Sequence, residues 1–409
     1  MTLGGLMNVG RYVLVAWFGV GCTSVDPTDS GGDSEVPDTD SGAPPDSNVD
    51  TDVPDTDVPD TDVADTDDTD IEALPARMAF FYQTVGNEDN AVMAGSTLDG
   101  FEIDSAGFTS IAWEGPMVAD NRYSDPVVSR MPDGTWTVTS RSAPTDSHGA
   151  HLLMYSENSC PEFPEIDDPN IHYLSALEGS ECITQTRTLM AKTSQVFEAD
   201  GEWYVFHAVE SELWLAHLGN AEQRPTELAG LCFVDNDELP AVGQTERIYS
   251  DQAEGWLISD AAISRRTDGT WVLFIKGIED GLCDTNGGLC ELCGRQIFRT
   301  TSEDLVEWTA LESVMTQASI PESTVDADGR VWLYWQDFTP ACDAQDLFLA
   351  NRAPISGAYE DAVGDLTSEG FVSFPEETFE RDTNQHYATN SNPVRVPGEA
   401  WADFLECVD

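Results

Sequence analysis

The sequence has little positive charge. Only 18 of its 409 residues are Lys or Arg, against 76 Asp or Glu, and the formal net charge is −58. Nucleic-acid-binding domains carry a basic patch, and basic segments bring proteins to anionic lipid. The shortage of Lys and Arg therefore argues against both kinds of partner, and the excess of negative charge favours solubility.

Several catalytic motifs are missing as well. The chain contains no Gly-rich phosphate loop, no His-Glu zinc motif and no Gly-x-Ser-x-Gly nucleophile elbow. These absences argue against phosphoryl transfer on a phosphate loop, zinc-dependent proteolysis and the common serine-hydrolase arrangement. We expect no required cofactor, and we retain a structural Ca²⁺ ion as an alternative.

The N-terminus is predicted to be an export signal over residues 1–21. Its apolar run, 12–20, follows Arg11 and is too short to span a bilayer. The run ends in Val-Gly-Cys, which resembles the lipobox of bacterial lipoproteins, so Cys22 is the predicted lipidation site. Thr23 follows the cysteine. An Asp at this position would favour retention at the inner membrane, so Thr23 predicts anchoring at the outer membrane. The alternative is an ordinary signal peptide with an incidental cysteine.

Residues 22–75 are predicted to be an acidic linker. Residues 23–72 hold 18 Asp or Glu and no Lys or Arg, and 50–70 repeat the phrase VPDTD. Like charges repel one another, and the segment has too little apolar surface to form a core. Both features predict an extended stalk. The alternative, a calcium-binding Asp array, lacks the turn glycine of known calcium loops, since Gly is absent from 43–84.

Eight cysteines follow Cys22, and an even number in an exported protein predicts disulfides. The alternative is a zinc site built on Cys283, Cys290 and Cys293, although no His lies in that segment. The eight are Cys160, Cys182, Cys232, Cys283, Cys290, Cys293, Cys342 and Cys407.

From residue 76 to 409 one pattern returns four times: an apolar run, an Asp-Gly pair and an aromatic-rich run. The four turn aspartates are Asp133, Asp200, Asp268 and Asp328. Asp-Gly between alternating apolar runs is a strong hairpin signal, because Gly tolerates the positive φ of a tight turn. Hairpins that repeat at a nearly constant period predict a β-propeller. Further strands are predicted after the hairpins at 150–156, 212–218, 296–302 and 346–352.

A fifth, degraded hairpin is predicted at 386–406, with Pro397-Gly398 at its turn. The chain then ends, and the runs 78–85 and 91–97 near its beginning can supply the missing outer strands. Closing the ring with both ends of the chain leaves no exposed sheet edge. The predicted fold is therefore all-β, a five-bladed β-propeller; six blades are the alternative if 98–121 forms more than a loop.

Carboxylates lie at the start of the first strands. Asp125 and Asp260 stand eight residues before their turn aspartates, and Ser194 and Glu322 stand six before theirs. Even separations place residues on one face of a strand if no bulge intervenes. First strands line the channel of a propeller, so we expect these groups at one mouth. Clustered carboxylates differ in pKa, which suits a general acid and a general base.

These positions resemble the five-bladed propeller glycosidases of glycoside hydrolase family 43, with family 32 as a relative. The family pattern of Asp-Pro in blade one, Asp in blade three and Glu in blade four matches Asp125, Asp260 and Glu322. The resemblance implies an inverting hydrolase in which Asp125 is the base, Glu322 is the acid and Asp260 positions the acid and tunes its pKa. It also covers the run Ser302, Asp304, Leu305 and Trp308, and His386 at the start of blade five.

The match has departures. Ala261 follows Asp260 where invertase relatives have Pro, and Ser323 follows Glu322 where Gly or Cys is usual. Glu322 also stands two residues nearer its turn than the two aspartates, about 6.6 Å along a strand. Each carboxylate has a structural alternative, such as a hydrogen bond to backbone at a turn or strand start.

Tyr123, Ser194, Trp256 and His386 are candidate substrate-binding residues, and Trp113 could also stack on a sugar. The alternative for the aromatic residues is packing in the propeller core, and for His386 a structural hydrogen bond.

The leading hypothesis is a surface-anchored, monomeric glycoside hydrolase with a carbohydrate substrate. The second hypothesis is a non-catalytic propeller that binds glycan or protein. A channel mouth that contains all three carboxylates, unpaired by Lys or Arg, would favour the enzyme.

Overall fold

A computed structural model describes the part of the chain that follows residue 76, with gaps. The described residues are 77–85, 91–97, 99–103, 109–112, 124–141, 151–156, 171–173, 195–209, 212–220, 232–234, 238–249, 255–282, 288–350, 353–361, 363–373, 387–396, 400, 401 and 404. The chain divides into two compact units, 1–69 and 70–409, and all described residues belong to the second. The described helices are all too short or too polar to cross a membrane.

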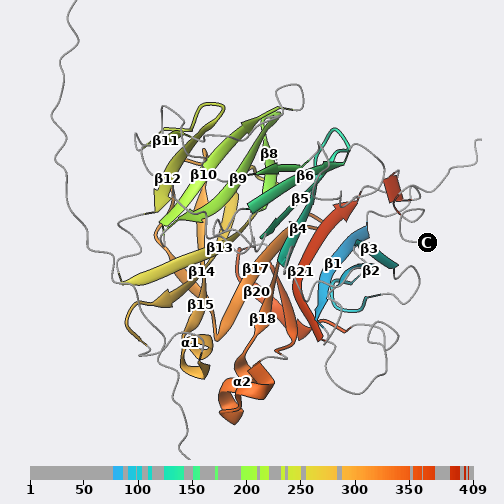
Figure 1. Cartoon of the computed structure of the whole chain (residues 1–409), viewed down its shortest axis with the longest axis vertical. Coiled ribbons are helices and arrows are strands. Elements are labelled where there is room, and N and C mark those ends of the chain that lie inside the picture. Colours follow the sequence, from blue (N-terminus) through green and yellow to red (C-terminus); the bar gives the residue numbers. More distant parts are fainter. Residues whose placement is uncertain are drawn as a thin grey trace, which may run out of the picture. The chain divides into compact units, whose positions relative to one another are not determined.

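The described strands form five sheets, so the predicted number of blades is confirmed (Figure 1). Blade one consists of β4 (Ser124–Arg130), β5 (Trp136–Arg141), β6 (His151–Ser156) and β7 (Ile171–Tyr173). Blade two consists of β8 (Val196–Ala199), β9 (Glu202–Val209), β10 (Glu212–Gly219), β12 (Gln244–Tyr249) and β11 (Cys232–Val234), which pairs parallel to β12. Blade three consists of β13 (Trp256–Arg265), β14 (Trp271–Glu279), β15 (Arg295–Ser302) and β16 (Glu312–Thr316).

Blade four consists of β17 (Ala318–Val325), β18 (Val331–Asp337), β19 (Ile355–Glu360) and β20 (Leu366–Phe371). Blade five joins the two ends of the chain in the order β21 (Tyr387–Val396), β1 (Arg77–Val85), β2 (Ala91–Thr97) and β3 (Thr109–Ala112). The predicted closure by strands from the beginning of the chain is therefore confirmed. Residues 98–121 contribute β3 as an outer strand of this blade, and the described strands form no sixth sheet.

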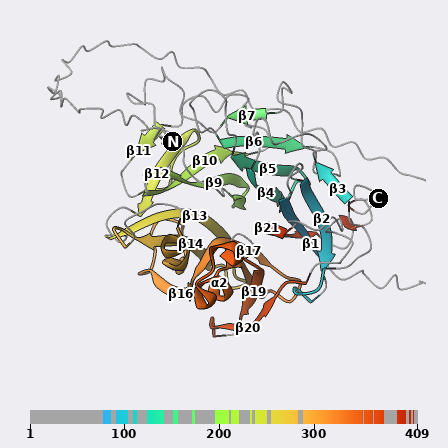
Figure 2. The same cartoon turned by 60° about the horizontal axis from the view of Figure 1, so that its bottom comes forward.

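The five sheets are arranged around a ring (Figure 2), and buried side chains pack between neighbouring sheets. One buried cluster joins blades two and three through residues such as Phe206 and Leu273, and another joins blades three and four. Phe80 of blade five packs on Tyr334 of blade four with ring centroids 5.1 Å apart, and Phe81 packs on Trp136 of blade one at 5.9 Å. Apolar side chains therefore pack across each of these seams.

The seam between blades three and four also holds a buried ion cluster. Glu360, whose side chain is 3% exposed, accepts hydrogen bonds from Arg266 Nε at 2.8 Å and from Arg299 Nη1 at 3.0 Å. Burial would lower the pKa of Arg299, but its hydrogen bonds to Glu312 and Glu360 outweigh burial and raise it. The cluster fixes the relative position of the two blades that carry Asp260 and Glu322.

The turn glycines behave as predicted. Gly134, Gly269 and Gly329 have φ of 88°, 94° and 82°, values that a Cβ would strain. Blade two has the tightest turn, in which Ala199 pairs directly with Glu202 around Asp200-Gly201. Asp133 and Asp268 each accept the backbone N–H two residues ahead at 2.9 Å, so their carboxylates act as turn residues.

Two strand predictions are wrong. The run 346–352 is not a strand: Leu347–Ala350 form the short helix α3, after α2 (Thr339–Ala344), and β19 is the third strand of blade four. Gln345, with φ 54°, ends α2 in a left-handed conformation and separates the two helices. Only Ala350 of α3 joins a buried cluster, which it shares with residues of α2 and of the distant helix α1 (Leu289–Cys293), whereas Leu347, Phe348 and Leu349 are exposed.

The prediction of a second strand in the fifth hairpin is also wrong. Trp401 and Phe404 have helical backbone, and Phe404 packs on Phe81 at 6.0 Å. β1 pairs with β21 and takes the place of that strand. Strand β1 therefore occupies the position beside β21 that the sequence pattern predicted for a strand after the Pro397-Gly398 turn.

Candidate functional site

The inner strands β4, β13 and β17 can be aligned on their turns. Their closing hydrogen bonds start at the N–H groups of Met131, Arg266 and Asp326. In this register Asp125 and Asp260 occupy equivalent positions, and the equivalent residue of blade four is Ile320. Glu322 lies two residues farther toward the turn, at the level of Ala262 in blade three.

All three inner strands contain a bulge at this level. Pairing shifts between Ser124 and Val127, between Ser259 and Ala261, and between Ser319 and Glu322. Asp260 and Ile320 have left-handed backbone, with φ of 44° and 54°. The condition of an unbroken strand, on which the predicted common face depended, is therefore not met. Strained backbone of this kind costs about 1–3 kcal/mol and is concentrated at functional sites.

Asp260 is fully enclosed and paired. Its side chain is 0% exposed, and it forms an ion pair with Lys276 of β14, whose side chain is 8% exposed. Ser259 Oγ lies 3.4 Å from Asp260 Oδ2. A buried carboxylate is costly unless a positive charge and hydrogen bonds compensate it, and the Lys276 ammonium group supplies that charge.

Glu322 is enclosed too, at 1% exposure, on β17 directly after Pro321. The start of its strand is held by Arg295, which donates to Ser319 Oγ at 3.2 Å and to Glu291 at 2.8 Å. The Arg295 guanidinium group also lies 5.8 Å from the centre of the Phe338 ring. The neighbouring strands β13 and β17 are joined by Ser264 Oγ and Ser323 Oγ, which lie 2.7 Å apart.

A disulfide supports this end of β17. Cys293 of α1 and Cys342 of α2 are bonded, which joins blades three and four through their short helices. Cys290 is disulfide-bonded as well. The disulfide prediction is thus confirmed for these residues, and the zinc alternative is wrong because sulfur in a disulfide is not a thiolate ligand.

The other predicted site residues are only partly described. Asp125 lies in β4, but its side chain is outside the described residues, as are Tyr123, Ser194, His386 and Trp113. Trp256 begins β13 and is half-buried; it packs edge-to-face on Phe298 at 4.8 Å and against the core between blades two and three. The described contacts of Trp256 are therefore packing contacts.

The run Ser302–Trp308 is a turn-forming element. Ser302 Oγ accepts the Leu305 N–H at 2.9 Å, and Asp304 Oδ1 accepts the N–H groups of Val306 and Glu307, both at 2.9 Å. These hydrogen bonds, led by the one from Glu307, lower the pKa of Asp304. Blade five contains the same arrangement at Thr97–Glu102, so its role is structural.

Gln195 is a channel residue that the sequence reasoning missed. It precedes β8; its Oε1 accepts the Ile263 N–H at 2.8 Å, and its Nε2 lies 3.5 Å from Ser323 O. The carboxamide group thus links the inner strands of blades two, three and four. A single glutamine before an apolar run gives no sequence signal for this cross-blade contact.

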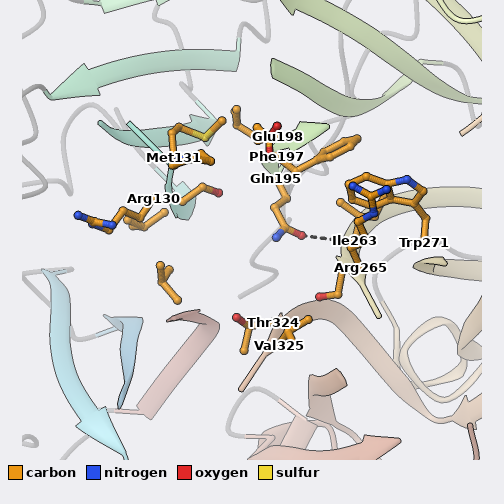
Figure 3. Close-up of a pocket in the computed structure, with 16 residues that line it drawn as sticks. Arg130, Met131, Gln195, Phe197, Glu198, Ile263, Arg265, Trp271, Thr324 and Val325 are labelled. Carbon is orange, nitrogen blue, oxygen red and sulfur yellow. Dashed lines mark hydrogen bonds between the residues drawn. The ribbon is translucent and has the colours of Figure 1, made fainter. Parts of the chain in front are cut away.

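A cavity of about 390 Å³ lies in the channel, and inner strands of all five blades line it (Figure 3). Its lining includes Val128, Phe197, Ile263, Thr324 and Val394. These residues lie toward the hairpin turns, whereas Asp260 and Glu322 lie nearer the strand starts. Of the acidic residues that the structure describes, Glu198 alone lines the cavity.

Comparison with known proteins finds solved structures of low similarity and no matching sequence family. No protein-family model and no curated protein matches the sequence. Among solved structures, a thermostable family-43 glycoside hydrolase is similar with 10% identity and a TM-score of 0.42, covering 73% of this chain and 91% of that one. An endo-1,4-β-xylanase from Bacteroides thetaiotaomicron has 10% identity and a TM-score of 0.40, covering 73% and 94%.

The exo-β-1,3-galactanase 1,3Gal43A from Clostridium thermocellum has 14% identity and a TM-score of 0.45, covering 72% of this chain and 59% of that one. At these identities the similarity carries no substrate or residue role across. The chain is a five-bladed β-propeller, as its own sheets show, and the solved structures similar to it include glycoside hydrolases.

No group of three or more His, Cys, Asp or Glu in the described part of the chain is arranged to hold a metal ion. The channel Ca²⁺ ion stays a prediction from the sequence.

Proposed function

We propose that this propeller is a glycoside hydrolase that acts where the inner strands begin. One observation carries the proposal: two enclosed carboxyl groups, Asp260 and Glu322, lie on neighbouring inner strands beside left-handed breaks in those strands. Enclosing a carboxyl group and straining the backbone both cost free energy without serving the fold. A catalytic use would explain why both costs occur on neighbouring inner strands, within two residues of each other in register.

The roles follow the family resemblance. Asp125 would deprotonate the attacking water, and Glu322 would protonate the leaving oxygen. Asp260 would position the acid, and its ion pair with Lys276 suits that role, because a carboxylate held by an ammonium group is a poor proton donor. Inversion requires about 6.5–9.5 Å between the carboxyl groups of Asp125 and Glu322, and about 5–5.5 Å would indicate retention.

The test is hydrolysis of a glycan library, followed by proton NMR of the first-formed anomer on any active substrate. Asp125→Asn and Glu322→Gln should each lower kcat about 10²–10⁴-fold, because each removes a proton-transfer group. The matched control is Asp133→Asn, which changes an exposed turn carboxylate of blade one and should leave kcat unchanged. Full activity in either site variant would contradict the assigned roles.

Non-catalytic binding is the second candidate, and two observations favour it. Asp260 is paired with Lys276, and the described lining of the channel cavity contains neither Asp260 nor Glu322. If the unmodified chain hydrolyses no glycan of the library but retains oligosaccharides on an affinity column, this second function replaces the first.

We further propose that the chain is exported and lipid-anchored through Cys22, with the acidic residues 22–75 as a stalk. The support is the apolar run 12–20 that ends at a small-residue pair before this cysteine. Two or more acyl chains give stable anchoring, which a single chain does not.

A further inference from the structure

Helix α1 carries two cysteines three residues apart, and the proposed function uses neither of them. Cys290 and Cys293 both lie within α1, and the Gly294 N–H donates to Cys290 O at 2.9 Å, as in a regular helical turn. In such a turn the Cα atoms of residues three apart are about 5 Å from each other. Disulfides span Cα distances of about 4.4–6.8 Å. A bond between Cys290 and Cys293 is therefore within reach of the helix geometry.

The two cysteines of α1 nevertheless belong to different disulfides. Cys293 is bonded to Cys342 of α2. Cys290 is disulfide-bonded as well, so its partner is another cysteine, whose side chain lies outside the described part of the chain. Reduction of the Cys290 disulfide would therefore place a thiol one helical turn away from the Cys293–Cys342 bond.

The two disulfides differ in their access to solvent. Cys290 is exposed, whereas Cys293 is half-buried and Cys342 is 4% exposed. The rate of thiol–disulfide exchange depends on whether the attacking thiolate can reach a sulfur atom. An external thiol therefore meets the Cys290 disulfide first, and the shielded bond between α1 and α2 is reached most directly from Cys290.

The surroundings of Cys342 can accommodate a thiol. A free cysteine packs as a small apolar side chain, so an apolar environment does not require it to be bonded. Cys342 lies in a cluster that consists of apolar residues of α1, α2 and the segment after α3, together with Phe338. The buried members are Phe338, Ala341, Ala350 and Ala353. A state with a Cys290–Cys293 bond and a Cys342 thiol is thus compatible with this packing.

We propose that α1 is a thiol–disulfide exchange site whose substrate is an external dithiol, such as a reduced thiol oxidoreductase. The dithiol is oxidised to its own disulfide, and its two electrons and two protons convert Cys290 and the partner of Cys290 into thiols. The Cys290 thiolate then attacks Cys293 Sγ. The Cys290–Cys293 bond forms, the Cys293–Cys342 bond breaks, and Cys342 leaves as a thiolate that takes up the proton lost by Cys290.

The exchange would remove a covalent link between two blades. Helix α1 connects β14 to β15 of blade three, and α2 follows β18 of blade four. The Cys293–Cys342 bond joins them across a sequence separation of 49 residues. These are the blades that carry Asp260 and Glu322, but the exchange itself does not depend on the proposed hydrolysis.

The experiment treats the full chain with submillimolar dithiothreitol under native conditions, quenches it with acid and labels free thiols with N-ethylmaleimide. Peptide mapping of the untreated chain by mass spectrometry first identifies the partner of Cys290. After mild reduction, the label should appear on this partner and on Cys342. The peptide that contains α1 should carry an internal Cys290–Cys293 bond and no label.

Two variants form a matched pair, because each loses the Cys290 disulfide and keeps one of its cysteines. Cys290→Ser should slow the labelling of Cys342 about tenfold or more, since an intramolecular thiol acts at an effective concentration of millimolar order. Replacement of the partner by Ser instead leaves Cys290 as a thiol from the start. In that variant Cys342 should be labelled without any dithiol.

Three results would overturn the proposal. The first is a Cys290 disulfide that resists the dithiol in the natively folded chain. The second is reduction that labels Cys290 and leaves the Cys293–Cys342 bond intact, which the map of the unmodified chain reveals even if a variant folds poorly. The third is labelling of Cys342 at the same rate in both variants, because the Cys290 thiol then has no part in breaking the bond.

Discussion

Replacing Lys276 by Met tests the buried ion pair on which the site description depends. The change removes the ammonium group beside Asp260, whose side chain is 0% exposed, and leaves a carboxylate in a place that water does not reach. Removing one partner of a buried pair costs about 3–5 kcal/mol. The second compact unit, 70–409, has about 340 residues, so its entropy of unfolding is about 0.7 kcal/mol per kelvin, and the loss should lower Tm by about 4–7 °C.

The assay is a double-mutant cycle measured by urea and thermal unfolding. Asp260→Asn alone should also destabilise the chain, because it leaves the ammonium group enclosed. The double variant, Lys276→Met with Asp260→Asn, should recover most of the lost stability, since a buried pair can often be replaced by neutral groups at little cost. Its hydrolytic activity should nevertheless stay low if Asp260 positions Glu322.

The matched control is Arg247→Met. Arg247 pairs with Glu212 at 3.4 Å, but the two side chains are 28% and 30% exposed, so the loss should be at most about 1 kcal/mol. The buried pair does not have the assigned energetic role if Lys276→Met lowers the free energy of unfolding no more than this control does. The same conclusion follows if the losses in free energy of unfolding from Lys276→Met and Asp260→Asn are additive in the double variant.

Two further predictions concern other parts of the chain. Burial would raise the pKa of Asp326, but hydrogen bonds from Trp332 and Arg330 outweigh burial and lower this pKa. The ionised Asp326 carboxylate therefore stabilises the folded chain above the unfolded pKa of about 4, and this stabilisation is lost as pH falls through the folded pKa. Asp326→Asn should therefore destabilise the chain at pH 7 and much less near pH 2; equal losses in urea melts at both pH values would contradict this. Cys22→Ala should release the protein from membranes or leave its signal uncleaved, and a membrane fraction with normally processed variant would refute lipidation.

Much of the fold could be predicted because its signals are local. An Asp-Gly pair and the alternating residues on either side of it specify a hairpin within about 15 residues, whatever surrounds them. Four such hairpins recur, and the runs 78–85 and 91–97 have the pattern of strands without a hairpin of their own. Blade number and ring closure follow from these facts. The same local signal also fixed the turn role of Asp133 and Asp268, which the structure confirms.

The failures are places where a distant part of the chain decides. The apolar run within 346–352 forms helix α3, which meets α1 and α2 through Ala350, and a disulfide joins α1 and α2 across two blades. The last hairpin lost its second strand because β1 pairs with β21 in its place. A pattern of two-residue period states what a segment can bury, and it does not state which neighbour will cover it.

For the site, the sequence by itself determined which carboxylates stand near the starts of the inner strands, and that Glu322 is two residues out of register with Asp260. Only the tertiary structure decided the bulges, the left-handed backbone of Asp260 and its ion pair with Lys276. It alone revealed Gln195 and the channel cavity, which strands of all five blades line. The physical reason is that hairpins are specified by neighbours along the chain, whereas a channel is specified by side chains that meet only after the ring has closed.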